Sequence, residues 1–586
     1  MEHLTFKLLC VVAIGSFGPG LVSSLTSSEI GEIDSFINGM IKCRNIPGLS
    51  LAIVKKDKIL HARAYGYADV EKGERATDST RFCIGSLTKA FTATLLAMLL
   101  GEREGMGWDT RIRDILGGSF HLSDDLRTGE ANIRDLLAHK LGVPAYFTPL
   151  LTGFPQDVTR EDIIGRLRFM EPKYEFRTKF QYNNYMYGLA GYVAEKLDGN
   201  GKTWEDLVRE RIFKPLGMDT AFFVDQGEEL TRFAMPYVTV NGTLRRVSTK
   251  TTRVVHPLGP AGSIAATCED MAKWLRFHLM EGKSIHNQTL ADMRLLGETY
   301  TGQMPEPAIH RDKTLPNFPV SDVSLSYDMA WLSAIYRGYK KVWHSGGIST
   351  YASHIWMYPE FNIGVYANYN GPTSQSAKGL EAIMYFVSDV LLGLPRWLNQ
   401  TAGCKYPDID GDPYDGDQPK KNGNQEKTEN LVYKNDSSRP LGEFVGVYGH
   451  LAFGNITISK NDTSGILQMK LGMLGEADLV PIAPDEFNLT WTGDLWYLQS
   501  SDMKSPSQKI IFNSSNIQGT IDTLYTKMDP KFSVPFKRGL KLSDAPIPNY
   551  KGYCIPSSSS PTFKSSYFLN LLIVLVVCLI TCPSVV

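Results

Sequence analysis

The segment Arg81–Leu100, with the sequence RFCIGSLTKAFTATLLAMLL, decides how the rest of the chain is interpreted. Its second half is apolar enough for a buried helix, but a hydroxyl, Ser86, and an amine, Lys89, stand near its start. Residues three apart in a helix lie on one face, about one turn from each other. The segment is therefore either a helix start that contains these residues by chance, or a nucleophile beside its base.

The chemistry of this pair depends on its surroundings. A serine hydroxyl becomes an effective nucleophile when a neighbouring base takes its proton. Lysine can be that base only where burial or another cation lowers its pKa. The apolar helix supplies burial here, and its N-terminus favours a developing alkoxide. The motif alone is weak evidence, because Ser501 and Lys504 repeat the spacing without an apolar helix behind them.

Two further motifs follow in the same region. The sequence QYNNY places Tyr182 and Asn184 directly before a predicted helix. The sequence WHSGG places His344, Gly346 and Gly347 in a stretch typical of a strand. Each motif is uninformative by itself, but the three in this order are rare.

Strand patterns at both ends of this region enclose several helical patterns. Apolar runs around a polar turn predict a hairpin over Gly48–Gly66, and short strands return over Ser333–Asn370. Helices are predicted over 86–100, 131–144, 183–197 and 268–279, and a last helix is predicted to begin at Gly379. The pattern favours an α+β fold in which an antiparallel sheet, built from both ends, is flanked by helices.

Changes in composition divide the remaining chain. We expect the domain with the three motifs to cover residues 25–398 and an acidic polar linker to cover 399–439, where apolar residues almost vanish. Short alternating segments over 440–545 predict a small all-β sandwich or barrel.

Both ends of the chain carry targeting patterns. Residues 1–24 combine a short polar start, an apolar run and small residues, as a secretory signal peptide does. Residues 546–586 hold a Ser-rich stalk and an apolar tail that no basic residue follows. This favours a GPI-anchor signal over a single membrane-spanning helix. We expect an exported protein, held at the outer cell surface or deposited in extracellular matrix.

Sequons and cysteines agree with export. The Asn-x-Ser/Thr sequons predict a glycoprotein, and they lie at Asn241, Asn287, Asn399, Asn435, Asn455, Asn461, Asn488 and Asn513. Five cysteines remain outside the signal peptide and the apolar tail, so at least one is free or pairs with another chain. Their pairing is open: they are Cys43, Cys83, Cys268, Cys404 and Cys554.

Bulk properties exclude other classes of function. A formal net charge of −1 over 586 residues gives no electrostatic case for a nucleic-acid partner. The sequence has no CxxC or HExxH pattern, so we expect neither a metal nor a cofactor. Cys83 is interpreted as a buried thiol or disulfide partner, and His139 as a residue that packs or caps near a helix end.

The ordered motifs and the sequence around them resemble the serine β-lactamase and penicillin-binding-protein-like family, in its class C, esterase and D-aminopeptidase branch. The resemblance covers about residues 37–395 and includes GLSLAIVKKDKILHARAYG, LLAHKLGVP and HSGGISTYASHIWMYPEFNIGV. The later stretch RPLGEFVGVYGHLAFGNITI resembles the lipocalin-like domain that often follows such a hydrolase. The resemblance implies a β-lactamase/transpeptidase-like fold followed by a small barrel.

The resemblance also implies roles for the motif residues. Ser86 would form an acyl-enzyme, with Lys89 and Tyr182 sharing the proton transfer. Asn184 would bind substrate or hold Lys89. The backbone N–H groups of Ser86 and Gly347 would form the oxyanion hole.

The third motif departs from the β-lactamase pattern at His344, where those enzymes carry lysine. With an ordinary pKa of about 6.5, histidine is largely neutral at pH 7 and cannot hold a substrate carboxylate as a fixed cation. We therefore expect an esterase or peptidase for a small amide, ester or peptide, and not an antibiotic β-lactamase. The alternative is a catalytically silent binding or structural protein on the same scaffold, such as a matrix component of mineralised tissue.

Overall fold

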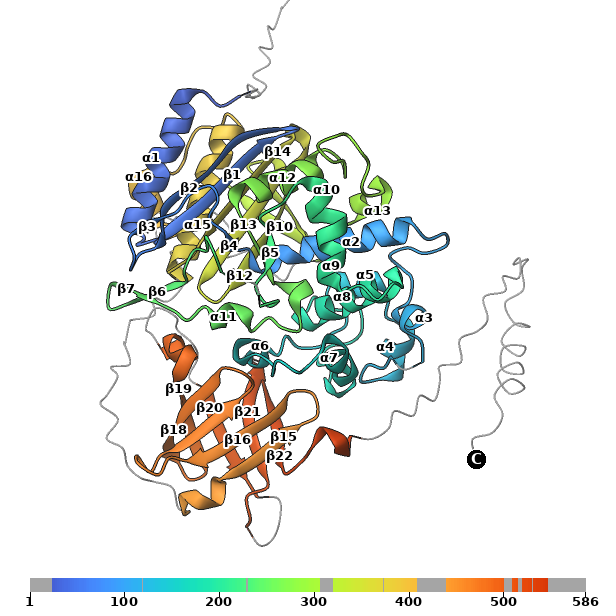
Figure 1. Cartoon of the computed structure of the whole chain (residues 1–586), viewed down its shortest axis with the longest axis vertical. Helices are drawn as coiled ribbons and strands as arrows, with labels where there is room; N and C mark the ends of the chain where they lie inside the picture. The colour runs from blue at the N-terminus through green and yellow to red at the C-terminus, as the bar shows by residue number, and fades with distance from the viewer. Residues whose placement is uncertain are drawn as a thin grey trace, which may run out of the picture.

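The computed structural model describes residues 24–118, 120–227, 230–305, 320–372, 374–407, 439–499, 508–514, 519–529 and 531–545. They form an α+β domain and a β-barrel, which lies below the first domain in the view of Figure 1. The predicted fold class is confirmed for both parts.

A nine-stranded antiparallel sheet organises the α+β domain. Strand β1, the third in the sheet, pairs with β2 on one side and with β14 on the other, where Leu49 lies opposite Tyr369. The two ends of the domain therefore meet in one sheet, as predicted. Across the sheet the strands are β3 (Glu74–Arg75), β2 (Lys58–Asp69), β1 (Gly48–Lys55), β14 (Ile363–Tyr369), β13 (Tyr351–Tyr358), β12 (Tyr339–Ile348), β11 (Leu332–Tyr336), β10 (Asp322–Tyr327) and β9 (Met304–Pro305).

Helices cover both faces of this sheet, so β1 is apolar on both sides. Leu49, Leu51 and Ile53 pack into a core shared with α1 (Ser27–Cys43) and α15 (Ser374–Leu391). The alternate residues Ala52 and Val54 belong to the opposite core. That core contains α12 (Cys268–Leu279) and the buried α2 (Thr88–Gly101).

Shorter elements complete the domain around α2. One small sheet contains β4 (Phe82–Cys83), β8 (Ile264–Ala266) and β5 (Phe222–Phe223). A second small sheet contains β6 (Tyr237–Val240) and β7 (Thr243–Arg246). The further helices are α3 (Ile112–Leu116), α4 (Asp125–Glu130), α5 (Ile133–Leu137), α6 (Phe147–Thr152), α7 (Arg160–Arg166), α8 (Asn184–Asp198), α9 (Trp204–Val208), α10 (Lys214–Leu216), α11 (Lys250–Arg253) and α13 (Met293–Glu298).

The predicted helix bounds were right for α12, nearly right for α8 and wrong in two places. The helix predicted over 131–144 ends at Leu137, because His139 takes a left-handed backbone conformation with φ 55°. The last helix begins at Ser374 and not at Gly379. Its polar first turns have the composition of a loop, which is why the sequence pattern misplaced its start.

The second domain is a closed antiparallel barrel, which the sequence pattern anticipated as a sandwich or barrel. It closes where β15 pairs with β22, with Tyr448 opposite Arg538. Its strands are β15 (Gly446–His450), β16 (Gly454–Lys460), β17 (Leu467–Leu471), β18 (Gly475–Ala483), β19 (Glu486–Trp491), β20 (Gln508–Asn513), β21 (Thr523–Asp529) and β22 (Phe532–Arg538).

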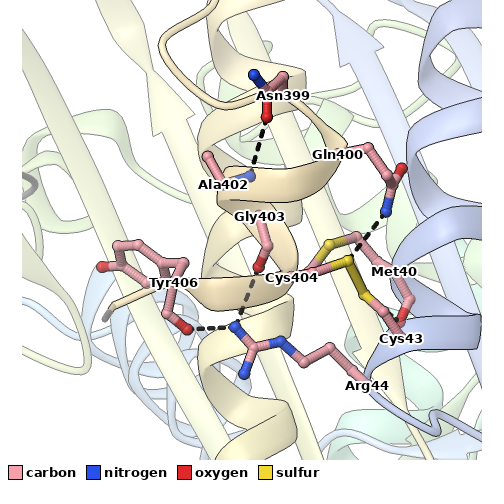
Figure 2. Close-up of a disulfide and its surroundings, with 9 residues drawn as sticks. All are labelled: Met40, Cys43, Arg44, Asn399, Gln400, Ala402, Gly403, Cys404 and Tyr406. Atoms are coloured by element: carbon pink, nitrogen blue, oxygen red, sulfur yellow. Dashed lines mark hydrogen bonds between the residues drawn. A yellow bond between two sulfur atoms is a disulfide. The ribbon is translucent and has the colours of Figure 1, made fainter. Parts of the chain in front are cut away.

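A disulfide between Cys43 and Cys404 joins the first helix to the end of the α+β domain (Figure 2). Cys404 lies in α16 (Gln400–Lys405), which is capped by the Asn399 carboxamide oxygen. The stretch assigned to a linker over 399–439 thus begins with a helix that packs on α1.

The structure also shows the state of two other cysteines, whose pairing the sequence left open. Cys83 and Cys268 are free, buried thiols. Burial raises the pKa of the Cys83 thiol well above its ordinary value, as expected for a structural cysteine and not for a nucleophile. Cys554 lies outside the described residues.

The targeting segments also fall largely or wholly outside the described residues: of residues 1–24 only Ser24 is described, and of 546–586 none is. Across the described ranges, no helix is both long and apolar enough to cross a bilayer. The predicted sequons are described except for Asn435. Asn461 and Asn488 are half-buried, and the exposed ones are Asn241, Asn287, Asn399, Asn455 and Asn513.

Candidate active site

Ser86 lies in a tight turn at the start of α2. The chain passes from β4 through a short 3₁₀ turn, Gly85–Leu87, into the helix. Gly85 has φ 51°, and a Cβ on it would lie 2.7 Å from the Gly347 nitrogen. Only glycine permits this backbone conformation together with such a close approach. The turn therefore brings the Ser86 backbone beside the strand that carries the third motif.

Lys89 is completely buried directly behind Ser86. Its Nζ lies 2.9 Å from Ser86 Oγ, 2.7 Å from Asn184 Oδ1 and 2.8 Å from the Ala261 carbonyl oxygen. Burial lowers the pKa of Lys89 well below its ordinary value. The burial expected from the apolar helix is therefore present.

The partners of Lys89 also orient its amine. The Asn184 and Ala261 oxygens can only accept hydrogen bonds, so they take the two N–H groups of a neutral amine. The ammonium form also donates to Ser86 Oγ, whereas in the neutral form the lone pair would be left for the Ser86 hydroxyl. Of the two roles considered for Asn184, the geometry supports holding Lys89, and the residue also reaches the pocket described below.

Tyr182 approaches the same hydroxyl from another segment. Its hydroxyl donates a hydrogen bond to Ser86 Oγ over 2.8 Å. Burial raises the pKa of the Tyr182 phenol above its ordinary value, and the hydrogen bond with Ser86 opposes that rise only in part. A neutral phenol in this position can pass a proton on, whereas the low pKa of Lys89 suits the role of base.

The third motif lies against the Ser86 turn. A Cβ on Gly346 would lie 2.0 Å from the Ile84 carbonyl oxygen, so this register requires glycine. Gly347 is exposed, and its nitrogen lies beside Gly85. Ser86 and Gly347 thus lie close together and line the same pocket, which is compatible with the oxyanion hole expected from the sequence.

His344 lies earlier in the same strand, β12, and is buried. Burial lowers its pKa to about 3, and the nearby Lys89 adds to this shift, so the imidazole is neutral at pH 7. Its Nε2 lies 3.2 Å from the Tyr327 hydroxyl and its Nδ1 lies 2.5 Å from the Ser345 carbonyl oxygen. These contacts fit a tautomer in which Nδ1 donates and Nε2 accepts. His344 supports the site from behind and offers no positive charge.

Two aromatic neighbours of the site were not recognised in the sequence as site residues. The ring centroid of His139 lies 4.5 Å from that of Tyr182 and 5.0 Å from that of Tyr327. His139 also accepts the Asn183 backbone N–H at Nδ1 over 3.2 Å. The interpretation of His139 as a packing residue is confirmed, but its place behind Tyr182 depends on tertiary contacts. No local sequence pattern predicts the position of His139 behind Tyr182.

A pocket of about 120 Å³, here called the Ser86 pocket, opens beside the nucleophile. Among the described residues, no side chain that lines it is charged, and most are aliphatic. It is lined by Ser86, Phe147, Leu150, Leu151, Asn184, Val254, Val255, Leu258, Ala261, Gly262, Gly347, Ile348 and Ser349. Of the site residues named from sequence, Ser86, Asn184 and Gly347 face the pocket, and Lys89, Tyr182 and His344 stand behind them.

Known proteins share this fold. The chain is 27% identical to unguisins hydrolase ungD' of Aspergillus campestris over 440 residues, which cover 72% of this chain and 76% of the relative. It is 30% identical to Gigasin-6 of Magallana gigas over 241 residues, which cover 40% of this chain and 78% of Gigasin-6.

Solved structures agree on the architecture. The octameric penicillin-binding protein homologue from Pyrococcus abyssi superposes with a TM-score of 0.51 at 20% identity, covering 87% of this chain and all of that one. The D-amino acid amidase of Ochrobactrum anthropi SV3 superposes with a TM-score of 0.50 at 23% identity, covering 62% of this chain and 98% of the amidase. The family model described as Beta-lactamase matches residues 33–385, which contain all three motifs. With a serine hydroxyl set between a buried amine and a phenol, this chain belongs to the beta-lactamase family of serine hydrolases.

Proposed function

We propose that this protein hydrolyses a small ester, amide or peptide through an acyl-enzyme on Ser86. One observation carries the proposal: Lys89 Nζ and the Tyr182 hydroxyl lie 2.9 Å and 2.8 Å from the same Ser86 Oγ. Acyl transfer needs a base that takes the proton of the nucleophile and an acid that protonates the leaving group. Both groups lie beside the Ser86 hydroxyl.

The steps balance with these groups alone. Neutral Lys89 takes the Ser86 proton while Oγ attacks the substrate carbonyl. The resulting oxyanion is held by the backbone N–H groups of Ser86 and Gly347. Tyr182 gives its proton to the leaving oxygen or nitrogen and is reprotonated from Lys89, and the C–O or C–N bond breaks. Water then attacks the acyl-serine by the same path, which releases the acid and restores Ser86.

The charge of the site narrows the substrates. Neutral His344 and an uncharged Ser86 pocket provide no fixed cation for a substrate carboxylate. Substrates with an uncharged acyl group therefore suit the site, and β-lactam antibiotics, which carry a carboxylate, do not.

Export is the second part of the proposal. The disulfide Cys43–Cys404 suits an oxidising compartment, and the exposed sequons suit glycan attachment. We infer a glycoprotein at the outer cell surface, held by a GPI anchor in preference to a single helix, or deposited in matrix. Loss of mass on treatment with peptide-N-glycosidase and release by a phosphatidylinositol-specific phospholipase test this inference. A protein that neither enzyme changes would contradict it.

Labelling with a fluorophosphonate probe tests the chemistry. The wild-type protein should label, and Ser86→Ala should not. Ser501→Ala is the matched control, because it removes the serine of the second Ser-x-x-Lys sequence and should label like the wild type. A folded wild-type protein that neither labels nor turns over esters or amides would support the silent binding scaffold. So would Ser86→Ala protein that keeps the wild-type effect.

A further inference from the structure

The helix α6 forms one wall of the Ser86 pocket. Phe147, Leu150 and Leu151 of this helix line the pocket. The helix has only six residues, begins after Tyr146 in a left-handed conformation, and has no side-chain N-cap. Such a short helix is not stable by itself, so contacts outside it must hold it in place.

The barrel domain supplies such contacts at the C-terminal end of α6. The turn between β17 and β18, residues Gly472–Leu474, lies against Thr152 and Gly153. The Met473 N–H donates to the carbonyl oxygens of Thr152 and Gly153 over 3.0 Å and 3.1 Å, and the Leu474 N–H donates to Thr152 over 2.8 Å. These bonds satisfy carbonyls that the end of a helix leaves without intrahelical partners.

A second set of contacts holds the N-terminal half of α6. The Thr148 hydroxyl donates to the Lys527 carbonyl oxygen of β21 over 2.9 Å. The ring centroid of Tyr146 lies 4.7 Å from that of Phe453 in the barrel. Barrel contacts therefore reach both ends of the helix, and α6 lies between the two domains in Figure 1.

The barrel also contacts the neighbouring walls of the pocket. Lys250, in the helix before Val254, pairs with Asp494 of the barrel at 3.4 Å. The Tyr497 hydroxyl faces the side chain of Ser349, an interaction that partly opposes the burial that raises the Tyr497 pKa to about 12. Three lining segments, around residues 150, 254 and 349, thus have barrel residues behind or beside them.

We propose that the barrel sets the shape of the Ser86 pocket, with Gly472, Met473 and Leu474 as positioning residues for α6. The inference rests on the proposed function for its effect on substrates. Its structural half, that the barrel holds α6, stands separately. Selection among acyl groups then depends on a domain whose described residues contribute no side chain to the lining of the pocket.

Two glycines of the barrel provide a matched test. Gly472 has φ 62°, and a Cβ on it would lie 2.0 Å from the Gly153 carbonyl oxygen. Gly465 has φ 72°, and a Cβ on it would meet nothing within 4 Å. Gly472→Ala and Gly465→Ala impose the same backbone strain on the barrel, but only Gly472→Ala pushes against the end of α6.

Hydrogen exchange measures the structural half without requiring turnover. Amide exchange over 147–152 should become about tenfold faster in Gly472→Ala, the change expected when contacts that close a marginal helix are lost. It should stay at the wild-type rate in Gly465→Ala. Equal rates in the two variants would overturn the proposal.

Chain-length selectivity measures the functional half. Esters from acetate to octanoate are compared by kcat/KM, and Gly472→Ala should lower the preference for the best chain length about tenfold, since one methylene in a fitted pocket is worth about that much. Gly465→Ala should keep the wild-type preference. Changed exchange with unchanged selectivity would refute the role in substrate choice. A wild-type protein without turnover would instead refute the proposed function and leave the exchange result standing.

Met473→Ala covers the case in which Gly472→Ala prevents the barrel from folding. The Met473 side chain lies beside Gly153, and shortening it leaves the turn backbone intact. Exchange over 147–152 should again rise, by less than in Gly472→Ala. Wild-type exchange in Met473→Ala protein would count against the proposal.

Discussion

Asn184 Oδ1 accepts a hydrogen bond of 2.7 Å from Lys89 Nζ, and Lys89 is fully buried. A carboxylate in place of this amide would stabilise the ammonium form of Lys89 and raise its pKa. Asn184→Asp should therefore move the acid limb of the kcat/KM–pH profile to higher pH, and lower activity at pH 7 by about 10- to 100-fold. An unshifted limb would contradict Lys89 as the base.

Lys89→Met separates catalysis from stability. A buried amine is replaced by an apolar side chain of similar length, which is often neutral or stabilising in a protein core. We expect kcat/KM to fall about 10³-fold or more, as for the loss of a general base that activates a nucleophile, while Tm stays within a few degrees of the wild type. A large loss of Tm together with the loss of activity would assign Lys89 a structural role.

Tyr182→Phe should show whether this phenol protonates the leaving group. Loss of a proton donor costs about 10²- to 10⁴-fold for a poor leaving group. The loss should be much smaller for p-nitrophenyl esters, whose leaving group needs no proton. Tyr192→Phe, the same change in the helix α8 that follows Tyr182 and outside the site, is the control. Equal losses for alkyl amides and p-nitrophenyl esters would exclude this role.

A buried acidic cluster behind the Ala261 turn predicts a pH dependence of stability. A Cβ on Gly259 would lie within 3 Å of both Asp225 Oδ2 and Glu205 Oε1, and Arg160 pairs with Glu205 at 2.6 Å. Burial first, and then the charge of Glu205, raise the pKa of Asp225 to about 7. Neither Asp225 oxygen has a hydrogen-bond partner among the described residues.

The sign follows from proton binding. Between the pKa of an unfolded aspartate, about 3.9, and about 7, the folded protein holds a proton that the unfolded chain has released. Stability therefore falls as pH rises through this window and levels off above pH 7. Asp225→Asn removes the titration, so its gain in free energy of unfolding over the wild type should grow by about 1.4 kcal/mol per pH unit at most. Denaturation at pH 5, 6 and 8 measures this, with exposed Asp219→Asn as a control whose difference from the wild type stays constant.

The disulfide should matter for stability and not for chemistry. Cys43→Ser with Cys404→Ser should lower the free energy of unfolding by about 2–5 kcal/mol, because the bond constrains a very long loop in the unfolded chain. Its helices α1 and α16 pack near α15 and have no part in the Ser86 pocket, so kcat/KM at 25 °C should stay at the wild-type value. A comparable loss of kcat/KM in folded protein would contradict this separation.

The sequence could predict which side chains gather around Ser86, because their motifs are local and ordered. Ser86 and Lys89 are about one helical turn apart, and Tyr182 and Asn184 flank Asn183, the residue that caps the next helix. The sheet could be predicted too, because β1 and β14 are apolar enough to be buried on both faces.

Other features depend on tertiary contacts that no local pattern encodes. His139 and Tyr327 meet behind Tyr182 from segments 188 residues apart, and neither neighbourhood resembles a catalytic motif. The contacts of Met473 and Leu474 with α6 are backbone hydrogen bonds, to which side-chain identity gives no guide. The helix α16 could not be predicted from the sequence, because it is short and lies at the start of a polar stretch.

The bridge joins Cys43 to Cys404 across a sequence separation of 361, and all three motifs lie between the two cysteines. A protease that nicks any loop within this ring therefore leaves both fragments covalently joined. The nicked protein would migrate at full mass on a gel without reductant and separate into pieces only after reduction. A cut after Cys404 instead releases the barrel fragment from this ring.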